Sequence, residues 1–80
     1  SPVHVLIIPK IHIPTLNDLN EEHKNLMGEL VFTAKLLAED LGIDEAGYRL
    51  NFNCNQAGGQ TVYHIHLHLM GGREFGWPPG

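Results

Sequence analysis

Three histidines alternate with apolar residues near the end of the sequence, in the run His64-Ile65-His66-Leu67-His68. Because side chains of a β-strand point alternately to its two faces, an extended run puts the three imidazoles on one face and the apolar side chains on the other. A plain core does not suit three imidazoles, since each ring carries polar nitrogens that need partners. The spacing therefore indicates chemistry rather than packing.

Two kinds of chemistry fit three imidazoles on one strand. The first is metal binding, because His-x-His can present two ligands to zinc and a third histidine can complete an open site. The second is attack on a phosphate, in which one neutral imidazole is the nucleophile and its neighbours donate hydrogen bonds or protons. No carboxylate lies near the run, whereas Gly58 and Gly59 offer backbone amides that can approach an anion closely. These features favour phosphate chemistry over a metal, with Thr61 and Asn53 as further polar groups.

Three segments of β-type sequence must position these histidines. Residues 3–9 form a nearly continuous apolar run that ends at a proline, which predicts a central strand covered on both faces. Residues 48–53 alternate and predict a second strand, and residues 55–60 predict a turn. Residues 61–70 predict a third strand, with Tyr63 on the apolar face beside Ile65. The second and third strands form a hairpin in this prediction.

A long amphipathic helix is expected between the first two strands. Asn17 or Asn20 would cap its start, and Gly42 would end it. At about 1.5 Å per residue, some twenty residues would span roughly 30 Å, enough to cross a whole sheet. Its apolar stripe follows spacings of three and four, at Leu26, Met27, Leu30, Val31, Ala34, Leu37, Ala38 and Leu41.

Composition limits the class of protein. Eighty residues suffice for one small domain. The net charge of −4, with five Lys and Arg in total, argues against a broad surface for polymeric nucleic acid but allows a small phosphorylated ligand. Cys54 is the single cysteine and cannot form an internal disulfide, so we expect a reducing, cytoplasmic setting. The longest apolar run, residues 5–9, is too short to span a bilayer, and we expect no membrane partner.

With its flanking residues, the histidine run resembles the motif of the histidine triad (HIT) superfamily. Three further stretches are similar to the nucleotide-binding Hint branch of that superfamily: Gly58-Gly59-Gln60-Thr61-Val62-Tyr63, Gly71-Gly72-Arg73 and Trp77-Pro78-Pro79-Gly80. The resemblance covers essentially all eighty residues. It implies an α+β fold in which residues 1–80 form a single HIT domain, with one long helix on one face of an antiparallel sheet.

The resemblance also implies an activity, namely hydrolysis of the P–N bond of purine nucleoside 5′-phosphoramidates by a homodimer that uses no metal and no cofactor. His66 matches the nucleophile, which would form a covalent nucleotidyl-histidine intermediate. His64 and His68 match the flanking pair, whose implied work is phosphate contact, orientation of His66 and proton transfer.

The same resemblance suggests a set of binding residues. Positions near the phosphate and the leaving group are matched by Asn53, Gln60 and Thr61, with the Gly59 amide close by, and His12 matches a fourth histidine at the edge of the site. The family usually has Ser at the position of Thr61, and the hydroxyl is kept. Trp77 is expected to reach the site of the partner subunit.

Alternatives remain at this point. Dinucleoside polyphosphate hydrolysis is the nearest one, because those relatives share the Gly-Gln-Thr lead-in, and a nucleotide-binding or partner-regulating protein with little catalysis is another. Hint proteins carry N-terminal strands before the position of Ser1 that supply most of the base pocket, so we expect this chain to be a shortened or partial form of a longer protein. On its own, the short chain would bind nucleotides poorly and associate strongly. His4, His23 and Cys54 receive no site role from the sequence.

Overall fold

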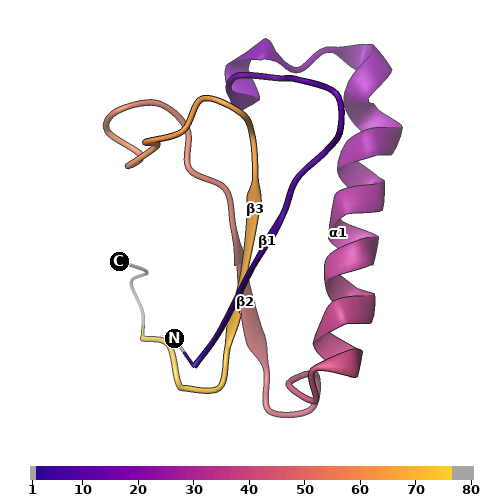
Figure 1. Ribbon diagram of the computed structural model, residues 1–80, viewed down its shortest axis with the longest axis vertical. Coiled ribbons are helices and arrows are strands. Elements are labelled where there is room, and N and C mark those ends of the chain that lie inside the picture. The colour runs from indigo at the N-terminus through magenta and orange to yellow at the C-terminus, as the bar shows by residue number, and fades with distance from the viewer. Residues whose placement is uncertain (1, 77–80) are drawn as a thin grey trace.

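One long helix lies against one face of a three-stranded antiparallel sheet in the computed structural model, which describes residues 2–76 (Figure 1). The strands are β1 (Val3–Ile7), β2 (Tyr48–Asn51) and β3 (Leu67–Gly71), and the helix is α1 (Lys24–Asp40). Two short 3-10 turns, η1 (Leu16–Asp18) and η2 (Glu21–His23), precede the helix. The predicted α+β class is confirmed.

The strand order β1-β3-β2 puts the histidine-bearing strand in the centre of the sheet. Within residues 2–76, β1 ends at Ile7 and pairs only with β3, so the central strand predicted for residues 3–9 is an edge strand of this three-stranded sheet. With α1 covering one face alone, the other face of β1 stays open, and Leu6 and Ile8 are 48% and 52% exposed.

The register of the strands separates the two faces of the sheet. Leu69 pairs with both Val5 and Leu50, and all three side chains belong to the core that packs against α1. The opposite face receives the alternate positions, so His68 lies between Leu6 on β1 and Asn51 on β2. The core on the helix side consists of Ile7, Leu30, Ala34, Ala38, Ile43, Leu67 and Leu69.

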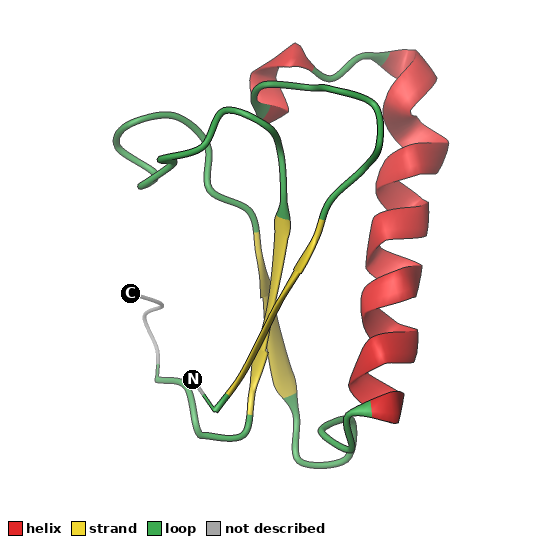
Figure 2. Ribbon diagram, in the orientation of Figure 1, coloured by secondary structure: helices red, strands yellow, loops and turns green. Residues whose placement is uncertain are grey.

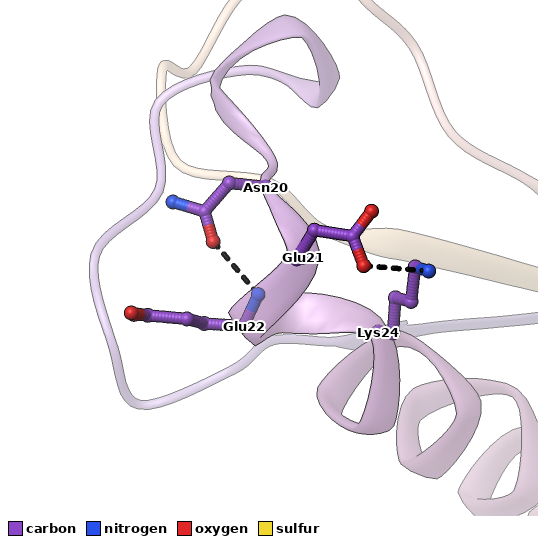
Figure 3. A network of polar contacts seen from close by, with 4 residues as sticks. All are labelled: Asn20, Glu21, Glu22 and Lys24. Carbon is purple, nitrogen blue, oxygen red and sulfur yellow. Dashed lines mark hydrogen bonds and ion pairs between the residues drawn. The ribbon is translucent and has the colours of Figure 1, made fainter.

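The start of α1 is built by local polar contacts (Figure 3). Asn20 accepts a hydrogen bond from the Glu22 amide at 2.9 Å, and Glu21 pairs with Lys24 at 2.7 Å. The expected cap at Asn20 is thus present, although it caps η2 and the α-helix proper begins only at Lys24.

The helix ends as predicted. Gly42 has φ +72°, and its N–H donates to the Glu39 carbonyl while the Ile43 N–H donates to the Ala38 carbonyl. This pair of bonds satisfies two free carbonyls and turns Ile43 back into the core.

Only part of the predicted apolar stripe is buried. Leu30, Ala34 and Ala38 face the sheet, whereas Val31 and Leu41 are exposed. Within residues 2–76, the structure contains no helix with the length and apolar character needed to cross a bilayer.

The predicted third strand is shorter than expected. Residues 61–66 form an irregular segment, and regular pairing starts only at Leu67 (Figure 2). Here the chain leaves the sheet to contact the loop after β1, where the Ile65 N–H donates to the Ile13 carbonyl at 2.8 Å. Tyr63, expected on the apolar face, is 48% exposed for the same reason.

Candidate active site

The three histidines of the motif lie together on the face of the sheet that α1 does not cover. The alternation holds through the irregular segment, since Ile65 and Leu67 are buried on the core side. His64, His66 and His68 are each half-buried. The ring centroids of His66 and His68 are 4.9 Å apart, so the predicted cluster exists.

The backbone fixes the orientation of the His66 ring. Its Nδ1 atom lies 2.8 Å from the His64 carbonyl oxygen. A carbonyl can only accept a hydrogen bond, so Nδ1 must carry the hydrogen. In a neutral imidazole the other nitrogen, Nε2, then holds a free lone pair.

His64 is anchored to the loop that follows β1. Its Nε2–H donates to the Pro9 carbonyl at 3.0 Å, and the ring of His12 meets it edge-on with centroids 5.0 Å apart. The structure therefore brings His12 to the edge of the histidine cluster, where the resemblance suggested it would lie.

His4 joins the cluster, although the sequence gave it no role. Its Nε2 atom lies 2.8 Å from the Nδ1 atom of His68, with ring centroids 5.1 Å apart. The pKa of His68 is lowered, first by burial and then by the neighbouring charges of His66 and His4. His68 is therefore neutral at neutral pH.

The sequence predicts that His4 joins the histidine cluster only if the register between β1 and β3 is known. It pairs with Met70 and shares the face of His68, but an antiparallel register shifted by one residue would have sent it to the core. Nothing local to residues 3–7 specifies that register.

A network of amides fixes the loop before the histidine run. Asn53 donates to the Gly58 carbonyl at 2.6 Å, and Asn51 donates to the side-chain oxygen of Asn53 at 3.0 Å. Gly58 packs so closely on Cys54 that an added Cβ would lie 2.5 Å from its carbonyl oxygen. Gly59 has φ +81°, as its turn requires.

Gln60, which the resemblance suggests near the phosphate, is held by contacts within the protein. Its side chain is buried and fully used within the protein: Nε2 donates to the carbonyls of Pro14 and Val62, and Oε1 accepts from the Asn55 amide. These bonds make Gln60 a brace between the loop after β1 and the loop before the histidine run. Thr61, next in the chain, is exposed.

An open groove of about 660 Å³ runs along this face from His68 toward the C-terminal segment. His64 and His66 are not among its lining residues, so they stand beside its end. The groove is lined by His4, Arg49, Asn51, Asn53, Ala57, Gly58, His68, Met70, Arg73 and Phe75. Arg49, Asn51 and Phe75 were not singled out from the sequence.

The metal alternative finds no preformed site in the part of the chain that the structure describes. Over residues 2–76, no group of three or more His, Cys, Asp or Glu side chains is arranged to hold a metal ion. Trp77, expected at the partner's site, lies outside the described residues.

These features define a histidine-triad fold with a polar groove, and comparison with known proteins agrees. The sequence model of the HIT domain family matches residues 1–75, and the chain therefore belongs to the HIT family.

Individual relatives are similar over most of this chain. It is 54% identical over 76 residues to the purine nucleoside phosphoramidase of Escherichia coli K12, covering 95% of this chain and 64% of that protein. It is 47% identical over 82 residues to the adenylylsulfatase HINT1 of Arabidopsis thaliana, covering 100% of this chain and 55% of that one. The chain thus spans less than two thirds of the length of both relatives.

A solved structure supports the architecture directly. The HIT family hydrolase from Legionella pneumophila Philadelphia 1 superposes with a TM-score of 0.98 at 56% identity, over 100% of this chain and 71% of that chain. The single-helix, three-stranded arrangement is therefore part of a longer HIT fold in that relative.

Proposed function

We propose that this protein is a nucleotide hydrolase that cleaves purine nucleoside 5′-phosphoramidates through a nucleotidyl intermediate on His66. The observation that carries the proposal is the 2.8 Å contact between His66 Nδ1 and the His64 carbonyl. It leaves Nε2 as a nucleophile whose tautomer is set by the backbone rather than by a titratable partner. The phosphoramidase name of the E. coli relative supports the substrate class.

In the first step, Nε2 of His66 attacks the α-phosphorus and forms an N–P bond while the bond from phosphorus to the leaving nitrogen breaks. The electron pair of that bond stays on the leaving nitrogen, which takes up one proton and departs as an amine. In the second step, water attacks phosphorus and breaks the bond to His66, releasing the nucleoside 5′-monophosphate. One proton of the water restores the proton donor, and the other passes to solvent.

We assign the proton donor to His68. Of the two paired rings, His4 is exposed and His68 is half-buried with a lowered pKa, so the hydrogen between them belongs to the better-solvated His4. His68 then accepts at Nδ1 and carries its own hydrogen on Nε2. As that hydrogen passes to the leaving nitrogen, Nδ1 takes over the hydrogen of His4, and the exposed ring of His4 takes up a proton from solvent, so that no ring becomes an anion.

The surrounding groups would bind the phosphate. Of the groups that the resemblance suggests, the side chains of Asn53 and Thr61 have donors left for a phosphate. The Gly59 N–H already donates to the Gln56 carbonyl, and the Nε2–H of His64 already donates to the Pro9 carbonyl. Neutral donors aimed at developing negative charge stabilise a phosphoryl transition state without holding the product as strongly as fixed cations would. His12 acts on this site through its contact with His64.

The purine would lie over β1. Leu6 and Ile8 are half-exposed aliphatic side chains on or beside the strand face that carries His4, and an apolar surface of this kind suits a flat base. The polar groove toward β2 would then hold the leaving group.

Association into a homodimer is part of the proposal. The outer edge of β2 has no partner within the described residues, and Met27, Gly28, Val31, Phe32, Lys35 and Tyr48 line an apolar hollow beside it. Joining two copies at this edge would satisfy the free backbone groups and cover Phe32, which is 59% exposed. Trp77 would then contribute to the partner's site. Analytical ultracentrifugation of the protein and of Phe32→Glu tests this, with a dimer expected only for the unaltered chain.

The reducing, cytoplasmic setting remains a proposal that rests on Cys54 being the single cysteine of the chain.

Turnover of adenosine 5′-phosphoramidate, measured as release of AMP with and without excess chelator, tests the function. Equal rates in both conditions support the metal-independent mechanism, and a rate abolished by the chelator contradicts it.

A further inference from the structure

Two guanidinium groups share one aromatic ring at the far end of the groove. The Cζ atoms of Arg49 and Arg73 lie 4.7 Å and 4.4 Å from the centroid of Phe75. Like charges repel, so two cations this close need a compensating interaction, which the electron-rich ring faces supply in part. Arg49 also donates to the Gly76 carbonyl and Arg73 to the Glu74 carbonyl, both at 2.9 Å.

Neither arginine has an acidic partner among residues 2–76. The two ion pairs found there, Lys24–Glu21 and Lys35–Glu39, both belong to α1 and its start. A guanidinium carries five N–H donors, and each of these arginines uses one of them in a hydrogen bond to a backbone carbonyl. The remaining donors of both groups are free to form a planar fork, the geometry that recognises a carboxylate or phosphate.

The arginine pair and the histidine cluster belong to one groove. Arg49 pairs with Met70, and Asn51, two residues along, pairs with His68 on the same face. Two residues of a strand advance about 7 Å, so Arg49 stands one side-chain row beyond His68. Arg49, Arg73, Phe75 and His68 all line the groove.

We propose that Arg49 and Arg73, spaced by Phe75, bind an anionic group on the leaving group of the substrate, either a carboxylate or a phosphate. The inference rests on the proposed function, which puts the reacting phosphorus beside His66. With the purine over Leu6 and Ile8, the leaving group extends past His68 along the polar groove. A carboxylate or phosphate about three or four bonds beyond the leaving nitrogen then meets the arginine pair.

The test compares each anionic leaving group with a neutral counterpart. Adenosine 5′-phosphoramidates of β-alanine and of β-alanine amide have the same length, and those of phosphoethanolamine and ethanolamine form the phosphate pair. We expect kcat/KM to favour the anionic member of at least one pair by roughly five- to tenfold at low salt, as a partly exposed ion pair would give. The pair that shows the preference identifies the anion.

The matched variants are Arg49→Gln and Arg73→Gln, with Lys24→Gln as the control. Each removes one positive charge, but Lys24 lies on α1, where its side chain is 72% exposed and away from the groove. The arginine variants should lose the preference while still hydrolysing the neutral substrates, and Lys24→Gln should keep it. Loss of the preference in all three variants equally would overturn the assignment to Arg49 and Arg73.

The comparison of charged and neutral substrates uses the unaltered protein, so its outcome does not depend on whether any variant folds. Equal kcat/KM for charged and neutral members of both pairs would overturn this inference and leave the hydrolase proposal standing. Absence of turnover with all four substrates would instead overturn the hydrolase proposal on which it rests.

Discussion

The Nε2 atom of His4 lies 2.8 Å from the Nδ1 atom of His68, although 64 positions separate the two residues in the sequence. The contact exists because β1 and β3 pair antiparallel, with His4 opposite Met70 and Leu6 opposite His68. An exposed ring on an edge strand thereby reaches a half-buried ring on the central strand. The histidine cluster thus includes His4 in addition to the three histidines of the motif.

Replacing His4 by Gln tests whether this contact sets the state of His68. A Gln side chain can donate a hydrogen bond to the Nδ1 atom of His68 but cannot pass a proton on to it, so proton delivery to the leaving group slows. We expect kcat to fall by roughly tenfold or more, with little change in KM. NMR titration of the His68 ring should show its pKa rising toward the ordinary value of 6.5, because the charge of His4 helps to lower it.

His23→Gln is the matched control for His4, since His23 lies in η2, away from the histidine cluster. It should leave kcat and the pKa of His68 unchanged. If the His4 variant had a normal kcat and an unchanged pKa of His68, the contact between His4 and His68 would have no role in catalysis.

The lowered pKa of His68 predicts a pH dependence of stability. The unfolded chain takes up a proton on this ring near pH 6.5, whereas the folded protein resists protonation until a lower pH. The unfolded state therefore binds more protons in that window, and the free energy of unfolding decreases as the pH falls below about 6.5.

Urea denaturation at pH 7.5, 6.5 and 5.5 measures this effect, with His68→Gln as the comparison. The variant should lose less stability on acidification than the unaltered protein. Identical pH profiles for the two proteins would show that His68 is not the group responsible.

Gln60 is predicted to matter for stability more than for chemistry. Gln60→Ala leaves the Asn55 amide and the carbonyls of Pro14 and Val62 without their partner, at a cost of about 1–3 kcal/mol in the free energy of unfolding. Gln60→Glu keeps the acceptor but loses both donated bonds, so it should destabilise the protein as well.

Gln56→Ala, in the same loop but exposed, should change the free energy of unfolding by no more than about 0.5 kcal/mol. If Gln60→Ala were as stable as Gln56→Ala while losing activity, Gln60 would be a substrate contact, as the family resemblance first suggested.

Local patterns in the sequence predicted much of this structure. The three-four spacing of residues 26–41 predicted α1, and Gly42 predicted its end, because both depend on nearby residues. The alternation of residues 64–68 predicted which side of the chain the imidazoles occupy, and it holds even where regular pairing has stopped.

The failures have a common physical cause, which is pairing between distant segments. The edge position of β1, the contact of His4 and the bracing role of Gln60 all depend on which segments meet, and no local propensity encodes that. The pair of arginines on Phe75 was not predicted for the same reason, since Arg49 lies near the start of β2 and Arg73 follows the end of β3, and only the pairing of the two strands brings them together.

The central claim is that His66 becomes covalently nucleotidylated. Rapid quenching of the protein with adenosine 5′-phosphoramidate, followed by peptide mass spectrometry, tests it most directly. We predict an adenylyl adduct on His66 within the first turnover, and no adduct with at least a thousandfold slower AMP release for His66→Asn. AMP release at the normal rate by His66→Asn, or an adduct on another residue, would contradict the account.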